Sequence, residues 1–279
     1  GPSGLSAAYH LARRGHTVTV KEAGPMAGGM MRFGIPRYRL PREVLDAEVQ
    51  RILDLDVTLE LDAKVTDLNT LRDDYDAVFL AVGAQIGKRA YIPAGSAAHM
   101  LDAVSMLRSL EEGEKPLLGR RVAVYGGGNT AMDAARTAKR LGASEAIVVY
   151  RRNKDHMPAH ESEFIEASEE GILFKWLTTI KQVDQGKLVI EKMELDESGF
   201  PQPTGELEEL EADSLVLALG QDTDLSLLDG VPGLVVDRGV VSVGPDMMTG
   251  CEGVFAGGDM VPFERSVTVA VGHGKKAAK

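Results

Sequence analysis

The sequence contains a single cysteine, Cys251, among its 279 residues, and it has no apolar run long enough to cross a membrane. One thiol can form neither an internal disulfide nor a cysteine-ligated zinc or iron–sulfur site, and it excludes a redox-active Cys-x-x-Cys pair. We therefore expect Cys251 to be a small, half-buried residue. We also expect the chain to lie in the reducing cytoplasm.

Positive charge is scarce as well. The chain has 31 basic and 42 acidic residues and a net charge of −11, which argues against a nucleic-acid partner and against an anionic membrane surface. Glycine, by contrast, is abundant with 31 residues, and 44% of the chain is apolar. This composition is typical of a well-packed α/β protein that is rich in tight turns.

One glycine-rich turn lies near the middle of the chain. The strand-forming run Arg121–Tyr125 leads directly into Gly126-Gly-Gly128, and a helical stretch of small residues begins at Asn129. This helix is expected to stop at Gly142. A strand, the pattern G-x-G-x-x-A and a helix in this order predict a dinucleotide-binding turn. In such a turn the helix N-terminus binds the pyrophosphate.

The next predicted strand, Ala146–Tyr150, ends in Arg151 and Arg152. A site for NAD usually carries Asp or Glu here, which accepts hydrogen bonds from the ribose 2′-hydroxyl, whereas arginine can pair with a 2′-phosphate. The two arginines therefore predict a preference for NADP(H). The alternative is that they form a solvated charge pair at the end of the strand.

A similar turn stands at the start of the sequence. Gly1 and Gly4 lead into a helical stretch that stops at Gly15, and a predicted strand then ends before Glu22. If Gly1 is the second glycine of the motif, the first glycine and its strand are expected upstream. Glu22 suits ribose hydroxyls and opposes an extra phosphate, which fits FAD or NAD. The alternative is a cloning remnant at Gly1-Pro-Ser before an ordinary amphipathic helix.

Three further strands end in residues that suit a ligand. Tyr75–Gly83 and Ala212–Gly220 are apolar runs that each close on a glycine. Ligands of open α/β sheets bind at the carboxyl ends of strands, so both glycines are candidate contacts, although a glycine can also simply end a strand. A last short strand ends in Gly258-Asp259, whose carboxylate can accept a hydrogen bond from a polyol such as the ribityl chain of FAD. The alternative for Asp259 is a helix cap or a turn residue.

Residues 181–200 alternate between polar and apolar side chains, which predicts an antiparallel meander. The acidic stretch Glu206–Glu211 is expected to be a solvated connection. A cluster of arginines near Gly34 is expected to form a solvated basic loop, with an acidic partner or the flavin as alternatives. These arginines are Arg32, Arg37, Arg39 and Arg42.

Seven segments together carry a family resemblance. They are GPSGLSAA at the start, GGMMRFGIPRYRLP at 28–41, YDAVFLAVGA, VAVYGGGNTAMDAARTAKRLGA, VVYRRNKDHMPAHESE at 148–163, LALGQDTD and GVFAGGDM. In this order the chain resembles the pyridine nucleotide-disulfide reductase superfamily. Within it the chain is most similar to the small (β) subunit of NADPH-dependent glutamate synthase and its relatives, including the corresponding part of dihydropyrimidine dehydrogenase. The absence of a redox-active cysteine pair agrees with this branch and not with the disulfide reductases after which the superfamily is named.

The resemblance implies an α/β fold with two Rossmann-like dinucleotide-binding domains. An FAD domain of residues 1–104 and 224–279 would contain, as an insertion, an NAD(P)H domain of residues 105–223. The resemblance assigns to FAD the residues Gly1, Pro2, Ser3, Gly4, Glu22, Ala23, Gly29, Val65, Ala81, Gly83, Gly258, Asp259, Val267 and Thr268. It assigns to NADPH the residues Gly126, Gly127, Gly128, Asn129, Thr130, Arg151, Arg152 and Gly220.

The resemblance also implies an electron-transfer function. Hydride would pass from NADPH to FAD, and electrons would leave through 4Fe–4S clusters, expected in a further domain or in a partner, to an electron-accepting partner subunit. The hydride step needs no side-chain acid or base, so we name no catalytic residue, and we expect His160 and Glu161 to begin a helix. One alternative is an NADPH-binding or sensing module without electron transfer. The other is a flavin disulfide reductase, which the single cysteine disfavours.

Overall fold

A computed structural model describes residues 1–95 and 99–279 of the chain. The chain forms two compact units. The first unit consists of Gly1–Ile86 and Asp222–Lys279, and the second unit, Gly87–Gln221, is inserted between these two segments. The chain thus leaves the first unit and returns to it, as the resemblance implies. The unit boundaries lie after 86 and after 221, so residues 87–104 belong by their contacts to the inserted unit.

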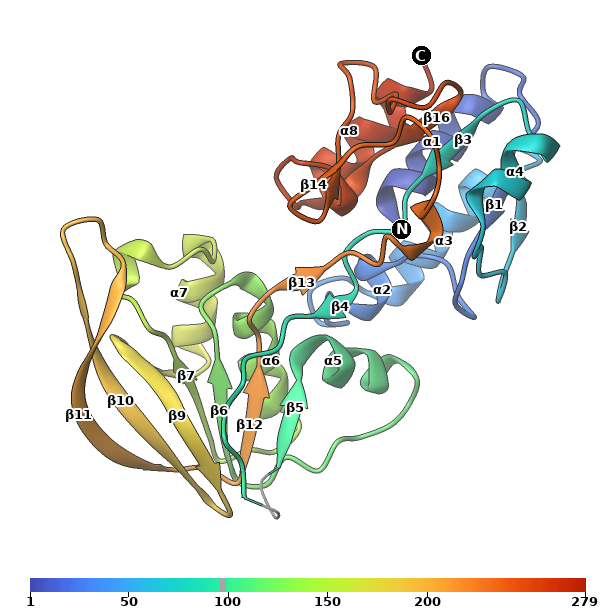
Figure 1. Cartoon of the computed structure of the whole chain (residues 1–279). Coiled ribbons are helices and arrows are strands. Elements are labelled where there is room, and N and C mark those ends of the chain that lie inside the picture. The colour runs from blue at the N-terminus through green and yellow to red at the C-terminus, as the bar shows by residue number, and fades with distance from the viewer. Residues whose placement is uncertain (96–98) are drawn as a thin grey trace. The chain divides into compact units, whose positions relative to one another are not determined.

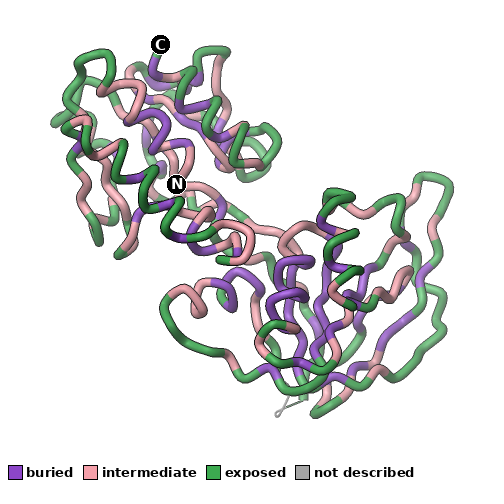
Figure 2. The backbone as a smooth tube through the Cα atoms, turned by 180° about the vertical axis from the view of Figure 1, so that it is seen from behind, coloured by how far each residue is buried: buried purple, intermediate pink, exposed green. Residues whose placement is uncertain are grey.

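A five-stranded parallel sheet forms the centre of the second unit (Figure 1). In spatial order its strands are β5 (Met100–Asp102), β12 (Ser214–Leu217), β6 (Arg121–Tyr125), β7 (Glu145–Val149) and β8 (Leu173–Lys175). All of β12 is buried, and so is β6 apart from its first residue (Figure 2). Such continuous apolar strands are expected where both faces of a parallel sheet are covered.

Helices cover one face of this sheet. They are α5 (Ala103–Glu111), α6 (Asn129–Arg140) and α7 (Glu161–Glu169), and a short 3-10 turn, η1, spans Lys154–His156. Alternate strand residues such as Val122 and Val148 pack against fully buried alanines of α6. Because alanine has a short side chain, α6 can lie close to the strands. The helix ends before Gly142, which has a φ of +104° and forms the expected stop.

The predicted meander covers the opposite face. It consists of β9 (Thr178–Asp184), β10 (Lys187–Leu195) and β11 (Pro201–Glu211), and its apolar residues pack on Ala123 and Leu215 of the sheet. The interpretation of Glu206–Glu211 as a connection was wrong, because these residues pair with β10 as the second half of β11. Their side chains are nearly all exposed and three of them pair with lysines, so the stretch lacks the apolar alternation of a half-buried strand.

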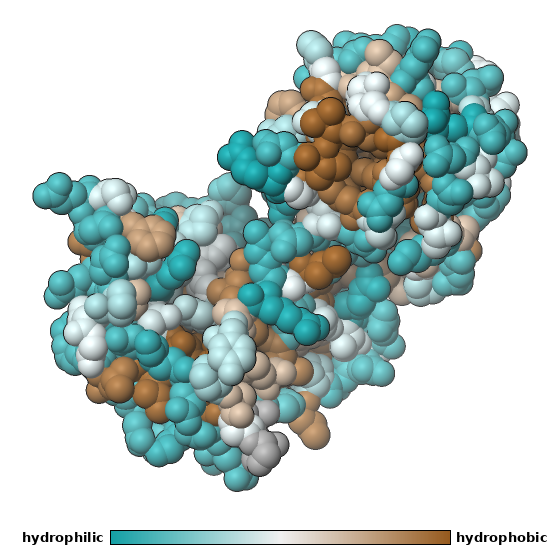
Figure 3. Space-filling model, in the orientation of Figure 1, coloured by the Kyte–Doolittle hydropathy of each residue, from teal (hydrophilic) through white to brown (hydrophobic). Residues whose placement is uncertain are grey.

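The first unit contains two pairs of parallel strands. β1 (Thr19–Lys21) pairs with β2 (Thr58–Glu60), and β3 (Val78–Leu80) pairs with β16 (Val254–Ala256). Strand β1 and most of β3 are only half-buried, and Figure 3 shows apolar side chains gathered at the surface of this unit. A small antiparallel pair is formed by β14 (Val236–Asp237) and β15 (Val240–Val241).

The helices of the first unit pack around these strands. They are α1 (Pro2–Ala12), α2 (Met30–Phe33), α3 (Arg42–Leu53), α4 (Leu68–Asp74) and α8 (Val267–Ala277), with the 3-10 turns η2 (Ser226–Leu228) and η3 (Gly258–Met260). β4 (Ile86–Gly87) pairs with β13 (Gln221–Asp222) where the chain passes between the units. Within the described residues, no helix combines the length and the apolar character needed to cross a membrane.

Helices α1 and α8 cross at close range. The Ser6 hydroxyl of α1 donates to the Val271 carbonyl of α8 at 2.8 Å. A Cβ on Gly274 would lie 2.3 Å from the Ser3 carbonyl oxygen, so only glycine permits this crossing. The contact brings the start of α1 next to the segment that leads into α8.

Candidate functional site

The glycine turn of the second unit lies at the carboxyl end of β6. Gly126 has a φ of +148°, and a Cβ there would lie 2.2 Å from the carbonyl oxygen of Ala218, so this position requires glycine. A Cβ on Gly127 would meet the ring of Tyr150 at 2.6 Å. At Gly128 a Cβ would meet nothing within 4 Å, so this backbone is open to a ligand.

Helix α6 begins directly after this turn. Its N-cap residue, Gly128, supplies no side chain to the first turn, and its carbonyl accepts from the Ala131 N–H at 2.9 Å. The N–H groups of Asn129 and Thr130 belong to the first turn of the helix, where donors have no intrahelical acceptor. Together with the positive end of the helix dipole, they suit a phosphate. The pyrophosphate of a dinucleotide fits this cradle.

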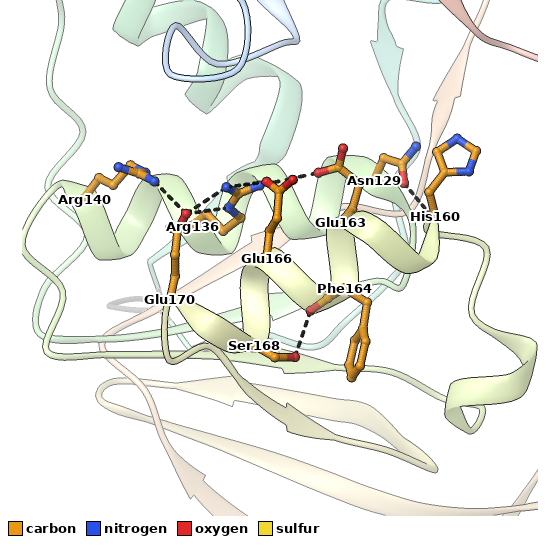
Figure 4. Close-up of polar contacts among 9 residues, drawn as sticks. All are labelled: Asn129, Arg136, Arg140, His160, Glu163, Phe164, Glu166, Ser168 and Glu170. Carbon is orange, nitrogen blue, oxygen red and sulfur yellow. Dashed lines mark hydrogen bonds and ion pairs between the residues drawn. The ribbon is translucent and has the colours of Figure 1, made fainter.

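The segment after β7 folds back onto the same turn. The Ala159 N–H donates to the Gly127 carbonyl at 3.0 Å, and the His160 N–H donates to Asn129 Oδ1 at 2.9 Å. His160 is the N-cap residue of α7, as expected from the sequence, and its side chain points away from α6 (Figure 4). The glycine turn and the start of α7 are therefore held together by two hydrogen bonds.

Arg151 and Arg152 follow β7 at the same edge of the sheet. Arg151 is exposed, and the Nε atom of the half-buried Arg152 has no hydrogen-bond partner among the described residues. Burial raises the pKa of the neighbouring Tyr150 hydroxyl, and the two guanidinium charges oppose this rise. Gly220, with a φ of +97°, follows β12 and lies at the same end of the sheet. The structure thus gathers the residues predicted for NADPH at the carboxyl ends of three neighbouring strands.

In the first unit, the start of α1 packs against several of the residues predicted for FAD. Pro2 occupies the first turn of the helix, where its missing N–H is not needed. A Cβ on Gly29 would lie 2.7 Å from Gly1 Cα, and a Cβ on Gly4 would lie 3.2 Å from Ala81 Cβ. The glycines therefore serve the close approach of a loop and of the end of β3 to this helix.

The turn after β16 reaches the same helix start. A Cβ on Gly258, which has a φ of +77°, would lie 3.1 Å from Ser3 Cβ. The Ser3 hydroxyl is buried and has no hydrogen-bond partner among the described residues. Burial raises the pKa of the adjacent Asp259 carboxyl, and the charge of Arg265 opposes this rise. An unsatisfied hydroxyl and a partly buried carboxyl are groups that the hydroxyls and phosphates of FAD can satisfy.

The other predicted FAD residues lie in separate places of the first unit. Glu22 and Ala23 follow β1, and one Glu22 carboxylate oxygen accepts from the Gly24 N–H at 3.0 Å. Val65 lines a pocket of about 380 Å³ that also contains Lys21. Gly83 has a φ of +70° and open space around it. Val267 and Thr268 are the exposed first residues of α8.

The arginine-rich loop differs from the prediction. Arg32 and Arg42 are buried, so the interpretation as a solvated basic loop was wrong for these two residues. Arg42 donates to four backbone carbonyls between residues 31 and 40, and Arg32 donates to the Ala27 carbonyl at 2.7 Å. Both guanidinium groups therefore satisfy carbonyls of the loop. Cys251 is also more deeply buried than expected, at 5% exposure.

Sequence reasoning missed three residues that shape the sites. Nδ1 of the buried His273 in α8 accepts from the Gly258 N–H at 3.1 Å, and burial, aided by Lys276, lowers the pKa of His273. Gly257 must be glycine because a Cβ there would lie 2.7 Å from Phe79 Cζ, but only the neighbouring Gly258 was assigned from the sequence. Arg136 of α6 is buried among carboxylates of α7. For Arg136, the only signal available in the sequence was a charged residue on the alanine face of α6.

Comparison with known proteins identifies the family. A model of the family described as pyridine nucleotide-disulphide oxidoreductase matches residues 1–274. The chain belongs to this family. This membership confirms the predicted superfamily and shows that the chain is an oxidoreductase.

Individual relatives agree with this assignment. The chain is 43% identical over its whole length to the NADP(+)-dependent formate dehydrogenase subunit beta of Moorella thermoacetica, and it spans 42% of that protein. It is 33% identical, again over its whole length, to a Cereibacter sphaeroides protein provisionally named as the small chain of NADPH glutamate synthase, of which it covers 74%. The chain thus spans less than half of the first relative.

A solved structure shows the same fold. FprA from Mycobacterium tuberculosis in complex with NADPH superposes with a TM-score of 0.82 at 19% identity, over all of this chain and 81% of FprA. The predicted fold class, two Rossmann-like dinucleotide-binding units of which one is inserted into the other, is confirmed.

Proposed function

We propose that this chain is the NADPH-oxidising, FAD-containing part of an electron-transfer enzyme. The second unit would hold NADPH and the first unit would hold FAD. FAD held there would supply the capacity to take up a hydride from NADPH and to release electrons singly. The electrons would then pass to 4Fe–4S clusters in a further domain or to a partner subunit. The relatives named as subunits of formate dehydrogenase and of glutamate synthase support a chain that works with a partner.

One observation carries this proposal. Each unit presents a glycine turn and a helix start at the carboxyl ends of parallel strands, but the strands that follow the two turns end in opposite charge. Glu22 would accept hydrogen bonds from the adenosine ribose of FAD, while Arg151 and Arg152 would pair with the 2′-phosphate of NADPH. Two dinucleotides of different charge are the reactants that a hydride transfer from NADPH to a flavin requires.

The roles of the side chains are binding and orientation. In the second unit, Gly128 and the first N–H groups of α6 would hold the pyrophosphate. In the first unit, Ser3 would donate its free hydroxyl to FAD, and Asp259 would accept from the ribityl chain. The similarity to the small chain of NADPH glutamate synthase supports the more specific proposal that this chain is a subunit of the glutamate synthase small-chain type.

An anaerobic titration tests the proposal. The full-length holoprotein is mixed with NADPH or with NADH, and the bleaching of the flavin absorbance is followed. We expect NADPH to bleach the flavin at much lower concentration than NADH. Binding of NADPH without bleaching would contradict the electron-transfer proposal and favour a sensing module.

A matched pair of variants tests the nucleotide preference. Arg151→Gln removes one charge-assisted contact, which is worth about 1.5–3 kcal/mol, so the Kd for NADPH should rise by about 10- to 100-fold while that for NADH changes little. Lys154→Gln removes a charge three residues away, in an ion pair with Glu161, and serves as the control. An equal effect of both variants would contradict a specific role for Arg151.

A further inference from the structure

The contact between α6 and α7 is built around one buried arginine (Figure 4). Arg136 of α6 lies 3.4 Å from Glu163, 2.9 Å from Glu166 and 2.7 Å from Glu170 of α7. These carboxylates are three and four residues apart, so they line one face of α7. Arg140, one turn further along α6, reaches Glu170 at 2.6 Å. The side chain of Arg136 is only 5% exposed.

This cluster does more than hold the two helices together. A buried ion pair is expensive to desolvate, and apolar residues of the same size would often stabilise a helix contact equally well. The apolar part of this contact involves alanines of α6 and Ala167 of α7, which are small and give little control over sliding. A planar guanidinium fixed by several carboxylates, in contrast, sets the position of α7 along α6.

The position of α7 decides a contact at its other end. The His160 N–H, at the N-cap of α7, donates to Asn129 Oδ1 at 2.9 Å. Because a backbone N–H can only donate, the oxygen of the Asn129 amide must face it, and the NH2 group can only be a donor. Asn129 is the first residue of α6, directly after the open backbone of Gly128. Its NH2 group is therefore a donor at the place where the pyrophosphate is proposed to bind.

We infer that Arg136 is a positioning residue of the nucleotide site. It holds α7 in the register at which the His160 N–H fixes the Asn129 amide, so that the amide NH2 donates to the pyrophosphate. The inference rests on the proposed function, because it requires a dinucleotide in the second unit. It assigns a role in binding to a residue two turns away from the ligand.

A double-mutant cycle on the full-length holoprotein tests this inference. The variants are Arg136→Lys, which keeps the charge but loses the planar fork, Asn129→Ala, and the combination of both. Glu169→Gln is the control, because Glu169 is an exposed residue of α7 that lies outside this cluster. Dissociation constants are measured for NADPH, for NADH and for adenosine 2′-monophosphate, which has no pyrophosphate.

We expect Arg136→Lys to raise the Kd of NADPH and of NADH by the same factor, about tenfold, as for the loss of one hydrogen bond to a charged group. The Kd of adenosine 2′-monophosphate should stay within about twofold, and Glu169→Gln should change none of the three. In the Asn129→Ala background, Arg136→Lys should have no further effect, because its effect acts through the amide.

Three results would overturn the inference. They are an unchanged Kd of NADPH in Arg136→Lys, additive effects in the double variant, and an equal loss of affinity for adenosine 2′-monophosphate, which would indicate a merely structural role. If Arg136→Lys does not fold, Glu170→Gln, at the half-buried end of the cluster, enters the same cycle. Failure of the proposed function is recognised separately, because the unmodified protein would then bind neither NADPH nor NADH.

Discussion

The crossing of α1 and α8 predicts that alanine substitutions at two glycines of α8 have opposite effects on the stability of the first unit. At Gly274 a Cβ would lie 2.3 Å from the Ser3 carbonyl oxygen and 2.6 Å from the Ala7 nitrogen, whereas at the exposed Gly272 it would meet nothing within 4 Å. Alanine in place of a glycine inside a helix raises the free energy of unfolding by about 0.5–1 kcal/mol. We therefore expect Gly272→Ala to stabilise the first unit by about this amount.

For Gly274→Ala this gain is outweighed. Both close contacts are to backbone atoms, so the helices must separate by about 1 Å, and such overpacking costs about 1–3 kcal/mol. Because no flexible side chain can yield, the cost should lie near the upper end. The two variants should then differ by about 3 kcal/mol, or at least about 1 M in the urea midpoint for an m-value of 1–3 kcal/mol/M.

Urea unfolding followed by circular dichroism measures this difference. The only tryptophan, Trp176, belongs to the second unit, so its fluorescence reports the unfolding of that unit and serves as an internal control. Gly274→Ala should lower the midpoint of the first unit and leave the fluorescence midpoint unchanged. Equal stability of the Gly272→Ala and Gly274→Ala proteins would refute the reasoning.

Two further predictions concern the first unit. Arg42→Lys should destabilise it by about 2–3 kcal/mol, since lysine cannot reach four carbonyls at once and buried acceptors lose their donors; Arg51→Lys, an exposed change in the same helix, should leave the urea midpoint unchanged. Burial raises the pKa of Asp259, against the opposing charge of Arg265, so its carboxyl takes up a proton at a pH above the usual value of 3.8. The charged carboxylate accepts a hydrogen bond from a hydroxyl about twice as strongly as the protonated carboxyl does. The affinity for FAD should therefore fall as the pH drops through this raised pKa. If the Asp259→Asn protein still loses affinity for FAD over the same pH range, the assignment is contradicted.

Local patterns were sufficient to predict several parts of the molecule. The turn at Gly126–Gly128, the stop at Gly142 and the antiparallel meander predicted over residues 181–200 depend on neighbours in the sequence, so residue type and spacing reveal them. Glu206–Glu211 was misinterpreted because sequence reasoning uses only such local patterns. It is an exposed strand that owes its structure to pairing with β10, and its own composition carries no strand signal.

The buried arginines show where local reasoning ends. Arg42 and Arg136 are charged residues in helices, and sequence alone places such side chains in solvent. They are buried because distant partners are available, the carbonyls of a loop for Arg42 and the carboxylates of α7 for Arg136. Those partners are defined only when the elements have packed.

The sequence by itself determined the family, the glycine turns with the helix and the strand that follow each of them, and the charge at the end of each of these strands. Glycine spacing and residue type suffice for these features because they are local properties of the chain. Only the tertiary structure decided which residues meet. It brought Gly29 onto Gly1, His273 onto the Gly258 turn, and the N-cap of α7 onto Asn129. Those contacts join residues that are 15 to 31 positions apart in the sequence, and they depend on packing distances that no local pattern contains.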